Sequence, residues 1–232
     1  SKRKLLIKKK IDSFGKKLPL YGVKIKLGIV TGDNKAFIID KKKKDELVSL
    51  DSKNNDVIYP VLRGKDCNKY FYNKPKDYII LTSNDIDVEK EYPSLVKYFE
   101  SFGDSFKKRT SKGKHWSNLR PCAFLNDFKN SKIFWAELSD TGQFSICDEE
   151  YYLLNSGYIM TVPENLNKEY LIGILNSKLI QFYMRCTSIT SGVGTMRWIN
   201  NHVSEIPIPK FNQDEHLSIV DTVKLIINEK KT

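Results

Sequence analysis

The chain has 232 residues, a hydrophobic content of 40%, and a net charge of +11 with a pI near 9.3. Enough apolar side chains are present to bury the core of one large domain or two small lobes, which excludes a disordered tail. No apolar run approaches the roughly 18 residues of a membrane-spanning helix, and the apolar stretch near the N-terminus is too short for a signal peptide. The positive charge indicates an anionic partner, with nucleic acid favoured over a membrane.

The first twenty residues predict a basic amphipathic helix. Residues 4–18 carry apolar side chains at helical spacing, with lysines on the other face: Ile7, Ile11, Phe14 and Leu18. Because the chain lacks an initial Met and begins inside this helix, we expect it to be a fragment of a longer protein. A solvated helix face is the commoner interpretation of residues 1–20; the family resemblance given below implies a basic connector helix instead.

The next segment, Tyr21 to Asp40, reads YGVKIKLGIVTGDNKAFIID and predicts a β-hairpin. Residues 23–30 alternate apolar and cationic side chains like a half-buried strand, and residues 36–39 form a second apolar run. The Gly-Asp-Asn between them is a hairpin signal. The polar tip suits an anionic, hydrogen-bonding surface, although an ordinary solvated turn has the same composition. It supplies four candidate DNA contacts: Thr31, Gly32, Asn34 and Lys35.

The middle of the chain alternates helices and strands. The lysine run 41–44 predicts a loop that enters a short helix, and residues 78–81 predict a buried strand. Pro93 fits the first position of a helix, whose apolar stripe follows: Leu95, Phe99, Phe102 and Phe106. Residues 132–138, 144–147 and 158–162 predict three further strands.

The C-terminal part predicts two helices. Asn167 is a candidate cap for a helix that runs to about Met184, and Asn212 with Glu215 resembles a capping box. The last helix presents an apolar stripe: Leu217, Val220 and Ile227. The whole pattern predicts an α+β fold in which mixed sheets support polar loops and helices pack at the flanks.

The strongest functional segment by chemistry is KKRTSKGKHWSNLR, residues 107–120. It has six cationic residues and no acid, and Ser111 and Gly113 favour a flexible loop. Lysines neutralise phosphates, whereas arginine also reads guanine bidentately. A solvated loop is the alternative. The candidate DNA contacts here are Lys107, Lys108, Arg109, Lys112, Lys114, His115, Trp116 and Arg120. We expect Lys107, Lys108 and Lys112 to be phosphate anchors.

A second candidate loop is TSITSGVGTMRW, residues 187–198. Its glycines match neither a P-loop nor a complete dinucleotide fingerprint. A polar, glycine-containing loop can approach a DNA backbone closely, although an inert connection is nearly as well supported. We expect Trp198 to lie in the hydrophobic core. The candidate contacts are Ser191, Thr195 and Arg197. Four side chains have the shape best suited to reading base edges: Asn34, Arg109, Arg120 and Arg197.

Five segments resemble one family when taken together in chain order. They are IKLGIVTGDNKAFIID, VIYPVLRGKDCNKY, EYPSLVKYFESFGDSFKKR with HWSNLR, LIGILNSKLIQFY and VSEIPIPKFNQDEHLSIVDTV. They resemble the TaqI-like C-terminal specificity domain, the DNA target-recognition part of adenine-specific DNA methyltransferases and fused restriction–modification enzymes. The second segment contains a further candidate contact, Arg63. The last also resembles half of a Type I restriction specificity subunit.

The resemblance implies a division of labour within a prokaryotic, cytoplasmic enzyme. Residues 21–211 would form the target-recognition domain for double-stranded DNA, and residues 212–232 a C-terminal helix packed on it or extending from it. A methyltransferase domain elsewhere in the same polypeptide would bind S-adenosylmethionine and flip the target adenine. This chain would then have no cofactor of its own.

Missing motifs agree with that division. The chain has neither a glycine-rich cofactor turn nor the Asn-Pro-Pro-aromatic loop of an amino-methyltransferase, and its single E-x-K, residues 229–231, ends a helix. Its cysteines lack metal-ligand spacing and fit a reduced, cytosolic protein: Cys67, Cys122, Cys147 and Cys186. We therefore expect no catalytic residues and no metal site.

Two alternatives remain at the level of sequence. The first is half of a Type I specificity subunit, which has a similar recognition unit and adjoining helix. The second is a protein-interaction module whose terminal helices assemble a restriction–modification complex. An RNA-binding function is less favoured because no recognised RNA module is present.

Overall fold

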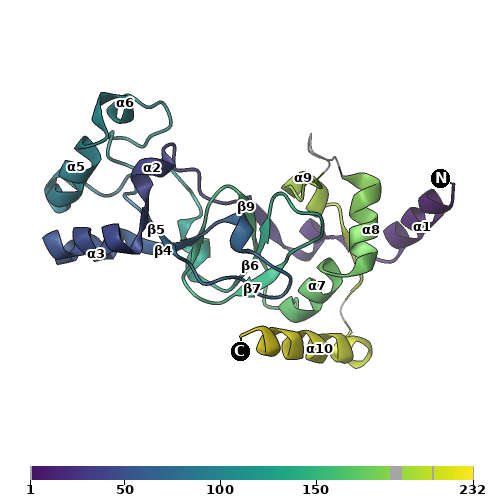
Figure 1. Cartoon of the computed structure of the whole chain (residues 1–232). Helices are drawn as coiled ribbons and strands as arrows, with labels where there is room; N and C mark the ends of the chain where they lie inside the picture. The colour runs from purple at the N-terminus through teal and green to yellow at the C-terminus, as the bar shows by residue number, and fades with distance from the viewer. Residues whose placement is uncertain (1, 189–194, 211, 232) are drawn as a thin grey trace.

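Two four-stranded sheets and two groups of helices build the chain in the computed structural model, which describes residues 2–188, 195–210 and 212–231. Figure 1 shows an elongated arrangement, with α3, α5 and α6 at one end, the sheets in the middle, and α1, α7 and α8 at the other end. The α+β class expected from the sequence is confirmed.

The central sheet has the strand order β2–β9–β6–β7 and is antiparallel throughout. Its strands are β2 (Lys24–Leu27), β9 (Gly157–Thr161), β6 (Lys132–Ala136) and β7 (Ser145–Cys147). Every residue of β6 is buried, because Phe134 enters one hydrophobic core while Ile133 and Trp135 enter the other. Strand β9 alternates in the same way, so this sheet is a shared wall between two cores.

The first core lies between the central sheet and a second sheet of order β3–β5–β4–β8. Strands β3 (Ile38–Asp40), β5 (Asp77–Ile80) and β4 (Ile58–Leu62) are antiparallel neighbours, and β8 (Tyr152–Leu153) joins β4 in parallel. The helices at this end are α2 (Asn34–Phe37), α3 (Lys41–Leu50), α4 (Val88–Glu91), α5 (Pro93–Glu100) and α6 (Gly103–Lys107). Short 3-10 turns are η2 (Ser52–Val57), η3 (Gly64–Asp66) and η4 (Leu125–Lys129).

The second core is mainly helical. It contains α7 (Lys168–Leu175), α8 (Lys178–Thr187), α9 (Asn200–Val203) and the terminal helices α1 (Lys2–Ser13) and α10 (Gln213–Lys231). The turn η1 (Leu18–Tyr21) follows β1 (Lys16–Lys17), which pairs with β10 (Pro207–Ile208). Helix α10 packs closely on α7 because Gly173 has no side chain: a Cβ there would lie 2.9 Å from Ile219 and 3.0 Å from Val223.

Several predicted local signals are confirmed. Strand β5 falls within one residue of the predicted range, and Pro93 is the first residue of α5. The side chain of Asn167 accepts the N–H of Tyr170 at 2.7 Å and so begins α7. Trp198 is fully buried, as expected for a core residue.

The predicted hairpin at residues 21–40 is wrong. Strand β2 pairs with β9 in the central sheet, whereas β3 pairs with β5 in the other sheet. The side chain of Asp33 accepts the N–H groups of Lys35 and Ala36, at 2.9 and 3.3 Å, which starts the short helix α2 where a strand was expected.

The helices also differ from their predicted extents. Asn176 ends α7, because its amide exchanges two hydrogen bonds with the backbone of Phe144, at 2.8 and 3.0 Å, and α8 then starts at a new cap, Ser177. The aromatic stripe 95–106 is divided between α5 and α6 at Gly103. The lysine run 41–44, expected in a loop, lies inside α3. In the apolar stripe predicted for α10, Val220 is buried but Leu217 is exposed.

The terminal helices share the second core, to which Ile11 of α1 and Val220 and Val223 of α10 contribute. The functional division into residues 1–20, 21–211 and 212–232 stays a prediction. Across the described ranges, no helix combines the length and the apolar character that crossing a membrane requires.

Candidate nucleic-acid interface

The basic loop, defined here as residues 107–120, follows α6 and is anchored at its C-terminal half. Leu119 donates its N–H to the Thr82 carbonyl at 2.8 Å, and the Thr82 hydroxyl donates to the carbonyl of Ser117 at 2.8 Å. The buried Asn118 amide donates to the carbonyls of Ser83 and Ile86, at 3.0 and 3.2 Å. Backbone groups and the buried Asn118 amide hold this half of the loop, and the expected flexibility stays a prediction.

Arg109 closes the basic loop on itself. Its guanidinium donates to the carbonyl oxygens of Phe106 (3.0 Å), Trp116 (2.6 Å) and Asn118 (2.7 Å). The same group lies 4.1 Å from the centre of the Phe106 ring and 5.0 Å from that of Phe37. Burial lowers the pKa of Arg109, while the nearby Asp33 raises it. Its buried Nε has no hydrogen-bond partner among the described residues. The side chain that sequence reasoning selected as a base reader thus has both Nη groups engaged within the protein.

The lysines of the basic loop fall into two groups. Lys107 is half-buried, with its ammonium 2.9 Å from Glu100 and 4.7 Å from the centre of the Trp116 ring. Lys108, Lys112 and Lys114 are exposed. Lys108 lies 3.9 Å from Asp104, and the Lys112 ammonium donates to the carbonyl of Lys107 at 3.0 Å. The exposed three are the ones free to meet phosphates.

The ring residues of the loop are half-buried. The Nδ1 atom of His115 lies 2.8 Å from the Ser117 hydroxyl, and its Nε2 atom lies 3.5 Å from Glu89. Trp116 meets the edge of Phe106 with ring centres 6.1 Å apart. One side of each ring supports the loop, so neither is a freely exposed stacking platform.

The predicted tip residues 31–35 lie against the basic loop. Gly32 has a φ of +80°, and a Cβ built on it would lie 2.0 Å from the Ser111 carbonyl oxygen. The buried Thr31 donates its hydroxyl to the Asn34 side-chain oxygen at 2.7 Å, while Asn34 and Lys35 are exposed. Two segments that are far apart in the sequence therefore meet at Gly32 and Ser111.

Arg120 lies on the border of a polar cleft of about 550 Å³, a feature sequence reasoning missed. The cleft is bounded by the 83–86 turn, the 119–129 segment and the aromatic pair Tyr59–Tyr152, whose rings lie 5.1 Å apart. Lys129 adds a second cation. The polar run LNDFKN, residues 125–130, carried a weak signal, but only the fold brings the 119–129 segment next to the 83–86 turn.

The remaining arginine candidates, Arg63 and Arg197, lie away from the basic loop, and each is connected to Ser156 through a neighbouring residue. Arg63 donates from Nε and Nη2 to Asp77, at 2.9 and 2.8 Å, and the next residue, Gly64, donates to the Ser156 hydroxyl. Arg197 donates to Glu137 at 2.6 Å, and the Glu137 N–H donates to the Ser156 carbonyl. Both guanidiniums are held by carboxylates.

Two further candidate contacts belong to the 187–198 segment. Thr195 is half-buried, and Ser191 lies outside the described residues. Within the described parts of the chain, no cluster of three or more His, Cys, Asp or Glu side chains is placed to hold a metal ion.

Comparisons with known proteins place this geometry in a family. The model of the TaqI-like C-terminal specificity domain matches residues 59–208. The Type IIL restriction–modification enzyme MmeI, solved in complex with DNA, shares the fold with a TM-score of 0.62 and 12% identity over 89% of this chain and 28% of that chain. The type IIG restriction endonuclease BpuSI gives 0.60 and 13% over 97% of this chain and 28% of its own.

The chain thus spans a little over a quarter of either enzyme. No curated protein matches the sequence. Because the family model covers well over half of the chain, this protein belongs to the TaqI-like C-terminal specificity domain family.

Proposed function

We propose that this domain reads a short duplex DNA sequence and holds it for an adenine-N6 methyltransferase domain of a restriction–modification enzyme. The observation that carries the proposal is the basic loop: a specificity domain presents a segment with six cations and no acid, fixed in place against the 31–35 segment. A loop whose backbone is already held in place loses little conformational freedom on binding, which favours an ordered contact with phosphates.

Phosphate contacts are assigned to the exposed ammonium groups. Lys35, Lys108, Lys112 and Lys114 lie on the surface formed by the basic loop and residues 31–35. Each phosphate they neutralise releases condensed counterions, so binding becomes weaker as salt is added. Lys107 contributes less, because its charge is already compensated by Glu100.

Base reading is assigned first to Asn34 and Arg120. Asn34 is exposed and has its amide NH₂ directed by the Thr31 contact to its oxygen, and Arg120 is exposed on the border of the polar cleft. Both side-chain types make bidentate contacts with purine edges. Arg63 and Arg197 would first have to leave their carboxylate partners, and Arg109 serves as the support of the loop.

The chemistry of modification is assigned to another domain of the intact protein. We infer that S-adenosylmethionine and the flipped adenine bind there, in a prokaryotic cytoplasm, and that this chain has no catalytic centre of its own. The missing cofactor turn and amino-binding loop support this division. Calorimetry with S-adenosylmethionine tests it, since saturable binding of the cofactor to this chain would contradict it.

The DNA proposal is tested in two steps. A labelled duplex titrated at several salt concentrations should give a log–log slope of about −3.6, as expected for about four phosphate contacts. Selection from a random duplex library should then enrich one motif. An affinity that does not change with salt, or the absence of binding at low salt, would contradict the proposal.

A further inference from the structure

The polar cleft of about 550 Å³ lies directly beside the basic loop. Leu119 and Arg120, the last two residues of that loop, also line the cleft. The 83–86 turn belongs to both regions, because it lines the cleft and its Asn84 side-chain oxygen accepts the N–H of Lys114 at 2.7 Å. The proposed DNA surface therefore continues into this cleft.

The cleft carries charges of both signs. Arg120 and Lys129 are exposed cations, and Asp56 and Asp85 are exposed carboxylates. The Asp85 carboxylate accepts the hydroxyl of Ser83 at 2.5 Å, and this hydrogen bond lowers the pKa of Asp85. A phosphate group is anionic and only accepts hydrogen bonds, so the two carboxylates oppose it. The cleft suits a group that both donates and accepts.

Part of the lining is apolar and aromatic. Leu81 and Leu119 are buried, and the ring of Tyr59 is half-buried. The Tyr59 hydroxyl donates to the carbonyl of Asp56 at 2.8 Å, and its ring lies 5.1 Å from that of Tyr152. An aromatic ring held in this way, among aliphatic side chains, offers a surface on which a planar base stacks.

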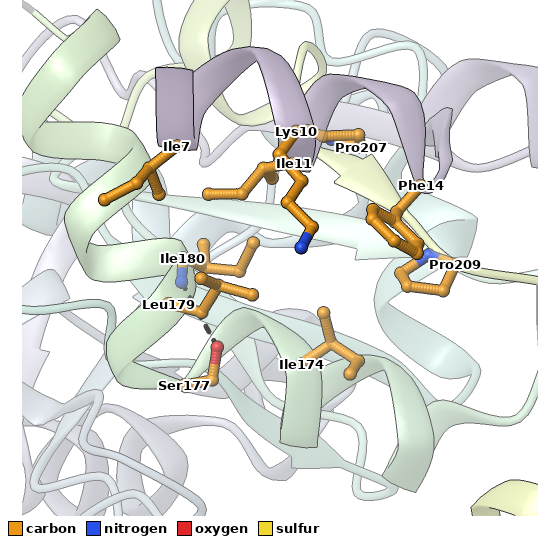
Figure 2. A pocket seen from close by; sticks show the side chains of 10 residues that line it. All are labelled: Ile7, Lys10, Ile11, Phe14, Ile174, Ser177, Leu179, Ile180, Pro207 and Pro209. Carbon is orange, nitrogen blue, oxygen red and sulfur yellow. Dashed lines mark hydrogen bonds between the residues drawn. The ribbon is translucent and has the colours of Figure 1, made fainter. Parts of the chain in front are cut away.

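The groove drawn in Figure 2 has a different chemistry. It lies between α1, the α7–α8 turn and β10, and Lys10 is the charged member among the described residues that line it. Figure 2 also shows that the hydroxyl of Ser177 is engaged by the N–H of Ile180, at 3.2 Å. The polar atoms of a base would be left without partners there, which is unfavourable. The polar cleft is therefore the better match to a nucleobase.

The concave shape of the cleft selects a group that projects from the DNA. Base edges in an intact duplex lie inside a groove and are reached by side chains that protrude into it. The groups that project outward are the phosphates and any base that has left the stack. Because the carboxylates disfavour a phosphate, an unstacked base remains. Such a base is read through the donors and acceptors of its pairing edge and is held by aromatic and apolar side chains.

We propose that the polar cleft binds one unpaired base of the DNA that this domain recognises. The base stacks on Tyr59, and its pairing edge donates to Asp56 or Asp85. It accepts from Arg120 or from the NH₂ group of Asn84, whose oxygen is already engaged by Lys114. The inference rests on the proposed function, because the lysines of the basic loop hold the DNA beside the cleft.

The test uses the whole 232-residue chain and three labelled duplexes with the same flanking sequence. One duplex is fully paired, one has a single bulged cytosine, and one has an abasic nucleotide as the bulge. A bulged base is already unpaired, so little energy is needed to extrude it. In fluorescence anisotropy the cytosine bulge should bind at least about tenfold more tightly than either other duplex. Equal affinity for the two bulges would overturn the proposal, since DNA flexibility would then explain any gain.

The thiol of Cys122 reports on the interior of the cleft, which it lines in a half-buried position. At saturation the cytosine-bulge duplex should slow the reaction of Cys122 with N-ethylmaleimide more than the abasic duplex does, as followed by mass spectrometry. Cys186 is an exposed thiol on α8, and its rate should be the same in the two complexes. Equal rates for Cys122 in the two complexes would overturn the proposal.

A matched pair of variants locates the contact. Asp56→Ala removes a carboxylate of the cleft, and Asp221→Ala removes an exposed acid of α10. Both raise the net charge by one, so both strengthen DNA binding in general. Only Asp56→Ala should reduce the preference for the cytosine bulge over the abasic bulge, by about fivefold or more. An equal preference in the two variants would contradict the assignment of Asp56.

A blocking variant tests the cleft as a whole. Ala123 is exposed and lines the cleft, so Ala123→Trp should fill the space without disturbing a core. It should abolish the preference for the cytosine bulge and leave both the affinity for the paired duplex and the thermal unfolding curve unchanged. A preference that survives this substitution would overturn the proposal.

The outcomes separate this inference from duplex recognition itself. If the paired duplex binds with the expected salt dependence and the bulged cytosine adds nothing, the cleft proposal fails and the proposed function stands. If only the cytosine-bulge duplex binds, the cleft proposal stands and duplex reading fails. Two further results would overturn the cleft proposal: protection of Cys122 by free deoxycytidine monophosphate at the same concentration, or tighter binding of the matching bulged RNA.

Discussion

The guanidinium of Arg109 lies 2.6 Å from the carbonyl oxygen of Trp116, seven residues further along the chain. Because it also contacts Phe106 and Asn118, this one side chain connects α6 to residues 116 and 118 of the basic loop. The loop therefore keeps its shape through an internal cation, while its exposed lysines remain available to a ligand.

Replacing Arg109 by Lys should destabilise the domain although the charge is kept. An ammonium on an unbranched stem does not reach three carbonyl oxygens at once, so buried acceptors lose their partners. We expect a loss of about 1–3 kcal/mol in the free energy of unfolding, measured by urea denaturation. DNA affinity should fall while the salt slope stays the same. Lys108→Ala, on the exposed side of the loop, is the control and should leave the urea midpoint unchanged.

The contact between Gly32 and Ser111 gives a second prediction with a built-in control. Gly32 and Gly103 both have positive φ angles, +80° and +73°, so alanine is strained by about 1 kcal/mol at either position. At Gly103 a Cβ has no neighbour within 4 Å, but at Gly32 it would lie 2.0 Å from the Ser111 oxygen.

Gly32→Ala should therefore cost about 1–3 kcal/mol more than Gly103→Ala, because the two segments must move apart. It should also weaken DNA binding, whereas Gly103→Ala should not. Urea unfolding and duplex titration of the two variants check this. Equal effects on both would mean that the 31–35 segment and the basic loop do not depend on each other.

The exposed lysines should act on salt dependence rather than on sequence preference. Lys112→Ala and Lys114→Ala should each reduce the magnitude of the log–log salt slope by about 0.9 and weaken all duplexes alike. Lys107→Ala should change the slope less, since Glu100 already pairs with that ammonium. Lys41→Ala, on α3 and paired with Asp45, is the matched control. An unchanged slope for both loop variants would remove them from the phosphate contact.

The buried thiol of Cys147 predicts how stability changes in alkaline solution. Burial raises its pKa from 9.0 to about 11, although the nearby Lys132 lowers it. Between these two values the unfolded chain releases the proton and the folded chain retains it. The free energy of unfolding should therefore fall as pH rises from about 9 to 11, by up to about 1.4 kcal/mol per pH unit for this group.

Urea midpoints measured across that range should show the decline, and Cys147→Ala should make it shallower. Part of the decline should remain, because burial also raises the pKa of Cys67. Cys186→Ala, which removes an exposed thiol, is the control variant. A profile that Cys147→Ala does not alter would show that another group controls it.

Local signals in the sequence were enough to predict the α+β class, the strand at residues 78–81 and the cap at Asn167. The cap at Asn167 acts three residues away, on Tyr170, and the strand is marked by its own apolar run. The hairpin at residues 21–40 failed because β2 and β3 find their partners at residues 157–161 and 77–80. That choice depends on which sheet offers a matching buried face, and a local turn signal does not contain it.

The candidate site could be predicted in composition but not in arrangement. The charge of the basic loop and the residues of the 31–35 segment were visible in the sequence, yet Gly32 and Ser111 are 79 positions apart. Arginine chemistry is the same toward a base edge and toward a backbone carbonyl, so only the fold distinguishes Arg109 from Arg120. The polar cleft is built from four separate segments and had no sequence signature of its own.

The alternation in β6 has a consequence for engineering. Since Phe134 belongs to one core and Ile133 and Trp135 to the other, a chimaera joined between the two ends of the molecule would exchange one face of a strand and leave the other behind. Each half would then present an apolar sheet surface with the wrong neighbour. When this domain is exchanged between related enzymes, the junctions are therefore best placed outside the terminal helices. Both cores are then transferred together with the sheet that they share.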